Sequence, residues 1–176
     1  MNVVFLDRDG TVITEPPDGR VTSIDKVKLF PDTIEALHYL AENDVAVVFI
    51  TNQACIADGY LTEPDFWKLH DEILKLLEPS HVNVLKTYMN PDSAGTVNEW
   101  RKPGPRMILQ AAEDLNIDIG STYMVGDRET DVQTAINAGC KGGVFIDTTK
   151  TNSTSPIAVY NATSLLDAVR YLVTHA

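Results

Sequence analysis

The sequence predicts a doubly wound α/β fold, in which a Rossmann-like parallel sheet carries helices on both faces. Short apolar runs rich in Val, Ile and Phe alternate with longer segments of helical periodicity along the 176 residues. Such alternation is typical of a parallel sheet with crossover helices. Hydrophobic residues make up 44% of the chain and charged residues 22%, which is ordinary for a chain that buries a core. The length predicts one domain, residues 1–176.

Five segments have the length and composition of buried strands. Each is short, apolar and rich in β-branched or aromatic residues, as strands covered on both faces are. They are Asn2 to Leu6, Val45 to Ile50, Val84 to Tyr88, Thr122 to Val125 and Gly143 to Ile146.

Five further segments show helical spacing of their apolar residues. The first begins at Pro31-Asp32, where Glu35 follows Asp32 by three residues as in a capping box, and it extends to Ala41. The fourth ends before Gly139, a residue type common just past a helix. The other four predicted helices cover Thr62 to Leu77, Pro105 to Leu115, Glu129 to Ala138 and Ser164 to Val173.

Three irregular stretches interrupt this alternation. Thr14 to Arg20 follows the first strand, Met89 to Trp100 follows the third, and the polar stretch Thr148 to Ser155 is expected to be a mobile connection. Ligands of open α/β sheets bind beyond the carboxyl ends of the strands. We therefore expect the first two stretches to overhang the functional edge of the sheet.

The charge of the chain restricts its partners. The formal net charge is −11 and the sequence pI is about 4.6, which argues against a nucleic acid or an anionic membrane as partner. A small anionic substrate remains compatible, because a few local cations and a bound metal can reverse the potential inside one cleft. We expect a monomer that takes a small molecule as its partner.

Nothing in the sequence indicates secretion. The N-terminus starts with the apolar run Val3 to Leu6, without the charged and apolar regions of a signal peptide, and no apolar run approaches the roughly 20 residues of a membrane span. Cys55 and Cys140 lie far apart, and we expect them to be reduced thiols. These features predict a cytoplasmic location.

The first strand ends in Asp7-Arg8-Asp9-Gly10-Thr11. Two carboxylates one residue apart face the same cleft if the backbone turns at Gly10. Like charges this close require a cation or a proton between them, so the pair indicates a metal site. Hard oxygen ligands in small number suit Mg²⁺. A solvated acidic turn is the alternative for such a pair taken alone.

Two weaker motifs accompany the pair. The second strand runs into Thr51-Asn52-Gln53, whose hydroxyl and amide groups can bind phosphate oxygens, although a turn or helix cap explains them equally well. Arg101-Lys102-Pro103 precedes the third helix, and Lys102 can neutralise a phosphate. A lone lysine there is usually solvated, so this interpretation depends on the neighbouring motifs.

The fourth strand ends in Gly126-Asp127-Arg128, and Asp131 follows Asp127 by four residues. Asp127 is expected to complete the metal site. Asp131 either contributes to that site through water or serves the first turn of the fourth helix, where negative charge is favourable. The four histidines, in contrast, show no pair with ligand spacing and are expected to be structural or solvated: His38, His70, His81 and His175.

Taken together, D-R-D-G-T, T-N-Q, R-K-P and G-D-R-x-x-D, in this order, resemble the haloacid dehalogenase superfamily over residues 2–147. Within it the chain is similar to compact phosphatases without a large cap domain, which act on D-glycero-D-manno-heptose 1,7-bisphosphate or on histidinol phosphate. Gly59 to Glu63 and Asn137 to Cys140 are similar to the heptose enzymes, whereas Thr14 to Pro17 and Gly126 to Asp131 match the histidinol-phosphate enzymes equally well. The heptose substrate is the preferred expectation.

The resemblance implies a role for each motif. Asp7 would be the nucleophile that forms an aspartyl-phosphate, and Asp9 the general acid and then base. Mg²⁺ would be held by Asp7, the backbone carbonyl of Asp9, and Asp127. Thr51 and Lys102 would hold the phosphoryl group. The remaining substrate contacts would come from Asn52, Arg101, Arg128 and the loop that begins at Glu15.

One departure from the resemblance is large. Many relatives carry a zinc loop, Cys-x-His and later Cys-x-Cys, before the R-K-P element, whereas this chain has Met89-Asn90-Pro91 and then Asn98-Glu99-Trp100. These residues offer no thiolate or imidazole, so we predict no structural zinc.

Three other classes of function fit these residues less well than a phosphatase does. A receiver-like signalling domain also phosphorylates an aspartate, but its acceptor ends a central strand and its acidic pair comes earlier in the chain. A catalytically inactive binding domain conflicts with the intact set Asp7, Asp9, Lys102 and Asp127. Nucleic-acid end repair conflicts with the acidic charge and the lack of a basic stripe.

Overall fold

The computed structural model describes residues 2–175 and contains one six-stranded sheet, in which all pairings between neighbouring strands are parallel. The strand order is β3-β2-β1-β4-β5-β6, so β1 is central, and after β3 the chain crosses back to place β4 on the other side of β1. The strands are β1 (Asn2–Leu6), β2 (Val45–Asn52), β3 (Val84–Asn90), β4 (Tyr123–Gly126), β5 (Gly142–Ile146) and β6 (Tyr160–Ala162).

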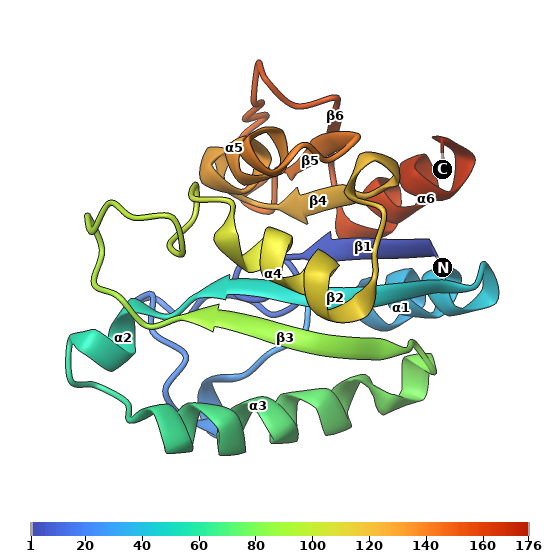
Figure 1. Ribbon diagram of the computed structural model, residues 1–176. Coiled ribbons are helices and arrows are strands. Elements are labelled where there is room, and N and C mark those ends of the chain that lie inside the picture. The colour runs from blue at the N-terminus through green and yellow to red at the C-terminus, as the bar shows by residue number, and fades with distance from the viewer. Residues whose placement is uncertain (1, 176) are drawn as a thin grey trace.

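Helices cover both faces of this sheet (Figure 1), as the alternation of strands and helices predicts. One face packs against α1, α3 and α6, and the other against α4 and α5. The α-helices are α1 (Thr33–Glu42), α2 (Ala54–Ala57), α3 (Glu63–Leu77), α4 (Arg106–Leu115), α5 (Glu129–Ala138) and α6 (Leu165–His175). Single 3-10 turns lie at Ile24–Lys26, Glu78–Ser80 and Ile119–Ser121.

Alternate residues of the central strand feed two separate cores. Val4 and Leu6 pack with α1, α3 and α6, whereas Val3 and Phe5 pack with α4 and α5. Successive side chains of a strand point to opposite faces, and burial on both faces explains why β1 is a continuous apolar run. Its carboxyl end is thereby fixed between β2 and β4, which is where the acidic motif begins.

The five predicted strands and five predicted long helices are all present. The predictions missed β6 and α2, because three or four residues give too short a pattern to recognise. β2 and β3 each extend two residues further than predicted, to Asn52 and Asn90, so Thr51 belongs to the strand itself.

The predicted capping box of α1 is wrong. Asp32 stands at the N-cap of α1 but makes no side-chain cap bond. Its Oδ2 accepts a hydrogen bond of 2.8 Å from the backbone N–H of Leu166 in α6 instead. A tertiary contact with the last helix therefore replaces the local one. Thr62, in contrast, caps α3 as its sequence position suggests, and accepts a bond from the N–H of Asp65.

Two further expectations concern membranes and thiols. Among residues 2–175, no helix combines the length and apolar character that a bilayer crossing requires. Cys55 and Cys140 are both free thiols, as expected for a chain without disulfides.

Candidate active site

A cleft of about 460 Å³ lies at the carboxyl edge of the sheet, on the side toward which the strand arrows of Figure 1 point. Asp7 follows β1, Thr51 is the penultimate residue of β2 and Asp131 lies in the first turn of α5 after β4, and these three strands are neighbours in the sheet. Lys102 enters from the segment before α4. The strand order therefore gathers motifs that are up to 124 residues apart in the sequence into one cleft.

Lys102 forms the buried centre of the cleft. Its Nζ lies 2.7 Å from Asp7 Oδ1 and forms an ion pair of 2.6 Å with Asp131 Oδ1, and it donates a hydrogen bond of 2.9 Å to the carbonyl of Ile50. Burial alone would lower the pKa of this amine, but the two carboxylates raise it overall. Lys102 is therefore a permanent cation beside Asp7.

Asp7, Asp127 and Asp131 form an acidic group in which one carboxylate oxygen from each residue lies within 4.8 Å of the other two. Burial, together with the neighbouring carboxylates Asp131 and Asp127, raises the pKa of Asp7 well above its usual range despite Lys102. Burial and Asp131 raise the pKa of Asp127 to about 6. Three carboxylates this close are stable as anions only with additional positive charge.

The donor chemistry of this acidic group fits a small hard cation. Its ligands are carboxylate oxygens, which Mg²⁺ prefers, and their charge exceeds what Lys102 neutralises. Gly10 has φ +88°, and a Cβ at this position would collide with the Asp127 carboxylate. The backbone thus approaches the acidic group closely enough that only glycine fits.

The two carboxylate oxygens of Asp131 face different neighbours. Its Oδ2 accepts the backbone N–H of Arg128 at 3.0 Å and caps α5, while its Oδ1 faces Lys102 in the acidic group. The first turn of α5 is therefore tied directly to the cleft.

Asp9 is held away from the acidic group by Arg8 and Gln53. Arg8 donates two hydrogen bonds to the Asp9 carboxylate, from Nε to Oδ1 at 2.6 Å and from Nη2 to Oδ2 at 3.1 Å. Gln53 donates a further hydrogen bond to Oδ2 at 2.9 Å. Burial would raise the pKa of Asp9, but Arg8 and then Gln53 lower it overall. Gln53 also donates to the Thr51 hydroxyl at 2.8 Å, which leaves that O–H free to donate into the cleft.

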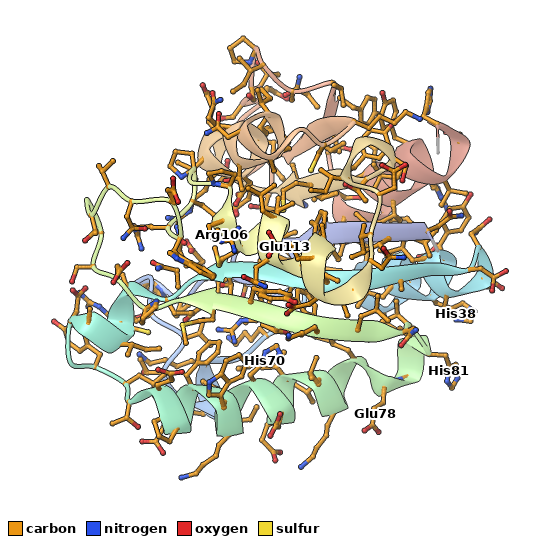
Figure 2. All side chains as sticks on the ribbon, in the orientation of Figure 1. His38, His70, Glu78, His81, Arg106 and Glu113 are labelled. Atoms are coloured by element: carbon orange, nitrogen blue, oxygen red, sulfur yellow. The ribbon has the colours of Figure 1, made fainter. Side chains whose placement is uncertain are left out.

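Arg8 is itself fully buried against α3. Its guanidinium lies 4.9 Å from the ring centroid of Phe66, and Nη1 donates to His70 Nδ1 at 3.4 Å. Because Arg8 can only donate, His70 carries its proton on Nε2, which donates to the Thr87 hydroxyl at 2.8 Å. Burial and Arg8 lower the pKa of His70 to about 4, so the ring is neutral. Figure 2 shows His70 between α3 and the sheet.

The rim of the cleft carries three arginines. Arg128 pairs with Glu15 at 2.5 Å. Arg101 donates from Nη1 to the carbonyl of Asp92 at 2.7 Å, and the guanidinium of Arg20 stacks 4.0 Å above the ring centroid of Tyr60. Across residues 2–175, neither Arg20 nor Arg101 has a carboxylate within 4.0 Å.

Asn52 lies beside the cleft with its amide already bonded. Its Oδ1 accepts the N–H of Lys102 at 3.1 Å and its Nδ2 donates to the Lys102 carbonyl at 3.3 Å. The structure thus places Asn52 as a clamp on the Lys102 backbone, and its contact with substrate stays a prediction.

Sequence reasoning missed three residues of this arrangement. Arg8 and Gln53 stand inside predicted motifs, D-R-D and T-N-Q, and their position next to named residues was the available indication. His70 was assigned a structural or solvated role, and no pattern in the sequence connects it with a residue 62 positions earlier.

The comparisons with known proteins agree with this geometry. The model of the HAD-hydrolase-like family matches residues 99–170. The D-glycero-beta-D-manno-heptose-1,7-bisphosphate 7-phosphatase of Yersinia pestis is 38% identical over 154 residues, which cover 84% of this chain and 81% of that protein. The chain belongs to the haloacid dehalogenase-like phosphatases. The Haemophilus influenzae phosphatase of the same name is 34% identical and covers 96% of this chain.

Other haloacid dehalogenase-like proteins match over different lengths. The histidine biosynthesis bifunctional protein HisB of Spirosoma linguale is 35% identical over 146 residues, but the chain spans only 38% of that protein's length. A crystal structure of D,D-heptose 1,7-bisphosphate phosphatase from B. bronchiseptica, complexed with magnesium and phosphate, superposes over the whole chain with a TM-score of 0.88 and 26% identity. Membership of this superfamily sets the receiver-like alternative aside.

Proposed function

We propose that this phosphatase is magnesium-dependent and transfers phosphate from a small sugar phosphate onto Asp7, with D-glycero-β-D-manno-heptose 1,7-bisphosphate as the preferred substrate. The observation that carries the proposal is the buried Asp7 carboxylate, paired with Lys102 at 2.7 Å and facing the cleft beside Asp127 and Asp131. A carboxylate so placed has a cation on one side and an open cleft on the other, as a phosphoryl acceptor needs.

The first step forms an O–P bond between the Asp7 carboxylate and the substrate phosphorus, and breaks the P–O bond to the sugar. The sugar oxygen takes a proton from Asp9. Lys102 and the Thr51 hydroxyl stabilise the phosphoryl oxygens during transfer. The first step needs protonated Asp9, and the negative charge of an entering phosphate raises the pKa of a nearby carboxyl.

The second step is hydrolysis of the aspartyl-phosphate. Ionised Asp9 takes a proton from water, the water oxygen attacks phosphorus, and Asp7 leaves as the carboxylate. The lowered pKa of Asp9 favours this step, because burial is outweighed by Arg8 and Gln53. Arg8 and Gln53 also fix the direction of the carboxylate from both sides.

Asp7, Asp127 and the backbone carbonyl of Asp9 would hold Mg²⁺, with Asp131 facing the same group. When bound, the ion offsets the repulsion between the carboxylates and an anionic phosphate. Asp7 and Asp127 both carry raised pKa values, so they are the groups whose ionised forms gain most from an added positive charge.

The rim favours a substrate with a second anionic group. Arg20 and Arg101 face the cleft without a carboxylate partner within 4.0 Å in the described chain, whereas Lys102, which is bonded to Asp7, would contact the reacting phosphate. A sugar bisphosphate can use such guanidinium groups, whereas the organic end of histidinol phosphate is cationic. The Yersinia pestis and Haemophilus influenzae relatives carry the heptose bisphosphate name.

Histidinol phosphate is the second candidate, and the kinship with the Spirosoma linguale HisB supports it. Carboxylates that also line the cleft, Glu15 and Asp58 among them, can receive a cationic amine. The two candidates therefore differ in which rim residues contact the substrate.

Steady-state kinetics with Mg²⁺ separate the candidates. We expect kcat/KM for heptose 1,7-bisphosphate to exceed that for heptose 7-phosphate and histidinol phosphate by about tenfold or more, the range of one charge-assisted hydrogen bond. Arg101→Ala should reduce this preference without lowering kcat on p-nitrophenyl phosphate. A preference for histidinol phosphate would transfer the proposal to the second candidate.

A further inference from the structure

The segment between β3 and α4 brings Arg101 and Lys102 to the cleft. It leaves β3 after Asn90, reaches α4 at Arg106, and contains neither a helix nor a strand (Figure 1, the yellow-green segment at the carboxyl edge). A stretch of this kind needs side-chain contacts to hold one conformation. The contacts that hold this segment therefore also position the rim of the cleft.

Zinc does not fit this segment. No Cys or His occurs from Met89 to Arg101, and the side chains that stand in place of the zinc loop are a thioether, a proline ring, two amides, a carboxylate and an indole. Structural zinc sites use thiolates and imidazoles. The side chains of this segment therefore do not fit the zinc loop that many relatives carry.

A set of hydrogen bonds, here called the Asp92 cluster, joins the start of the segment to its middle. It consists of Asn90, Asp92 and Asn98. Asp92 Oδ2 accepts from Asn90 Nδ2 at 2.9 Å and from Asn98 Nδ2 at 2.7 Å, and Asn90 Oδ1 accepts the backbone N–H of Asp92 at 3.2 Å. The bonds from Asn90 and then Asn98 lower the pKa of Asp92, which keeps the acceptor ionised.

Asn98 couples the cluster to the rim. Its Oδ1 accepts the backbone N–H groups of Trp100 at 2.9 Å and of Arg101 at 2.8 Å. Because those two donors fix the position of the amide oxygen, Nδ2 must face Asp92. The Arg101 guanidinium then donates back to the Asp92 carbonyl, so both the backbone and the side chain of Arg101 are bound to cluster residues.

Two backbone contacts connect this segment to the start of α4. The carbonyl of Glu99 accepts the N–H of Arg106 at 2.8 Å at the start of α4. Gly104 lies so close to the carbonyls of Asn98 and Glu99 that an added Cβ would overlap both. The segment is thus packed against the entry to α4 by its own backbone.

We propose that the Asp92 cluster takes the place of a structural metal and positions Arg101 for the non-reacting part of the substrate. Asp92 and Asn98 are accordingly positioning residues, and the specificity of the rim depends on the bond between them. The proposal rests on the proposed function for the identity of the substrate, but not for the conformation of the segment.

Isosteric variants test the central bond. Asn98→Asp keeps the oxygen that binds Trp100 and Arg101 but turns a second carboxylate oxygen toward Asp92, so the bond becomes a repulsion. The double variant Asp92→Asn/Asn98→Asp exchanges donor and acceptor, so it restores the bond between positions 92 and 98 and the net charge, but it gives up the bond that Asn90 Nδ2 donates to residue 92. Glu99→Gln is the control, because this neighbouring side chain makes no hydrogen bond or ion pair in the described chain.

We expect Asn98→Asp to raise KM for heptose 1,7-bisphosphate about tenfold, with kcat on p-nitrophenyl phosphate unchanged, and the double variant to recover part of the loss. Hydrogen exchange of the Trp100 and Arg101 amides should accelerate in Asn98→Asp and slow again in the double variant. Glu99→Gln should match the wild type in both measurements.

The outcomes distinguish this inference from the proposed function. If no heptose phosphate is turned over, the proposed substrate is wrong, and the exchange measurements still test the cluster. If Asn98→Asp exchanges like the wild type, or the double variant is no better than the single one, the inference fails. It also fails if the purified protein holds one equivalent of zinc and a zinc chelator accelerates exchange in residues 91–104.

Discussion

At the scale of single residues, the account depends on a buried lysine between carboxylates. Lys102 has a 4% exposed side chain and contacts Asp7 and Asp131, whose side chains are 8% and 1% exposed. Removing one member of a buried ion pair leaves an uncompensated charge, which is far more costly than losing an exposed pair.

Lys102→Met should therefore lower the free energy of unfolding by about 3–5 kcal/mol in the presence of EDTA, measured by urea denaturation. Lys75→Met is the matched control, because Lys75 pairs with Glu72 in solvent, and we expect no measurable change. Equal effects of the two substitutions would contradict the buried triad.

His70 gives a second prediction, for pH. Its pKa is about 4 in the folded protein, because of burial and Arg8, against about 6.5 in an unfolded chain. The folded state binds the proton less tightly, so the stability that neutral His70 contributes is present above pH 6.5 and is lost as the pH falls toward 4. The charged groups that face it are Arg8 and Asp9.

Comparison with His70→Gln isolates this effect, since glutamine does not titrate. The stability advantage of the wild type should shrink by roughly 3 kcal/mol between pH 7 and pH 4 in urea titrations at each pH. Carboxylates of the acidic group are present in both proteins and cancel in the difference. Parallel stability curves would show that His70 is not buried against Arg8.

At the scale of elements, α3 links the core to the cleft. Its inner face packs Ile73 and Leu77 against the sheet and presents Phe66 and His70 to Arg8, while Leu76 points outward. The amphipathic pattern that predicted this helix therefore also determines which of its residues contact Arg8 in the D-R-D motif.

Ile73→Ala and Leu76→Ala test that orientation on the same helix. Ile73 is fully buried, so its truncation should cost about 2–5 kcal/mol of unfolding free energy, whereas Leu76 is 43% exposed and should cost less than about 1 kcal/mol. Denaturant midpoints of the two variants give the comparison. A reversal of the two costs would mean that the helix is rotated.

At the scale of the whole molecule, the acidic group makes stability depend on a cation. The chain has a net charge of −11, and three carboxylates converge in the cleft. A ligand that binds only the folded state stabilises it by about 2.7 kcal/mol at a hundredfold excess over its Kd. Mg²⁺ should therefore raise Tm, by about 5–10 °C for a chain of this size.

Asp127→Asn is the control for that shift. The variant loses one ligand and one of the crowded charges, so we expect a higher Tm than the wild type in EDTA and a much smaller response to Mg²⁺ in calorimetry. A full Mg²⁺ response in Asp127→Asn would place the cation elsewhere.

The sequence predicted the fold and the gathering of Asp7, Thr51, Lys102 and Asp127, because strand ends of a parallel sheet meet at one edge whatever their separation in the chain. It could not predict contacts that depend on how a helix is rotated, such as Arg8 with His70. The Asp92 cluster could not be predicted for a similar reason, since its bonds depend on the path of an irregular segment.

Short elements are a further feature that could not be predicted from the sequence. β6 has three residues and α2 has four, and neither carries a periodic pattern of its own. Asp32 shows the converse case, in which a local motif was recognisable but a tertiary bond to Leu166 replaced it. Local patterns are overridden where a longer-range contact offers a better partner.

The central claim is that phosphate passes through the carboxylate of Asp7, and trapping the intermediate tests it most directly. The enzyme would be mixed with Mg²⁺ and heptose 1,7-bisphosphate, quenched in acid and reduced with borohydride, which converts an aspartyl-phosphate to homoserine. Mass spectrometry of the peptide that contains residues 1–8 should show homoserine at position 7, only when substrate is present. Phosphate release without any reduction at Asp7 would contradict the account.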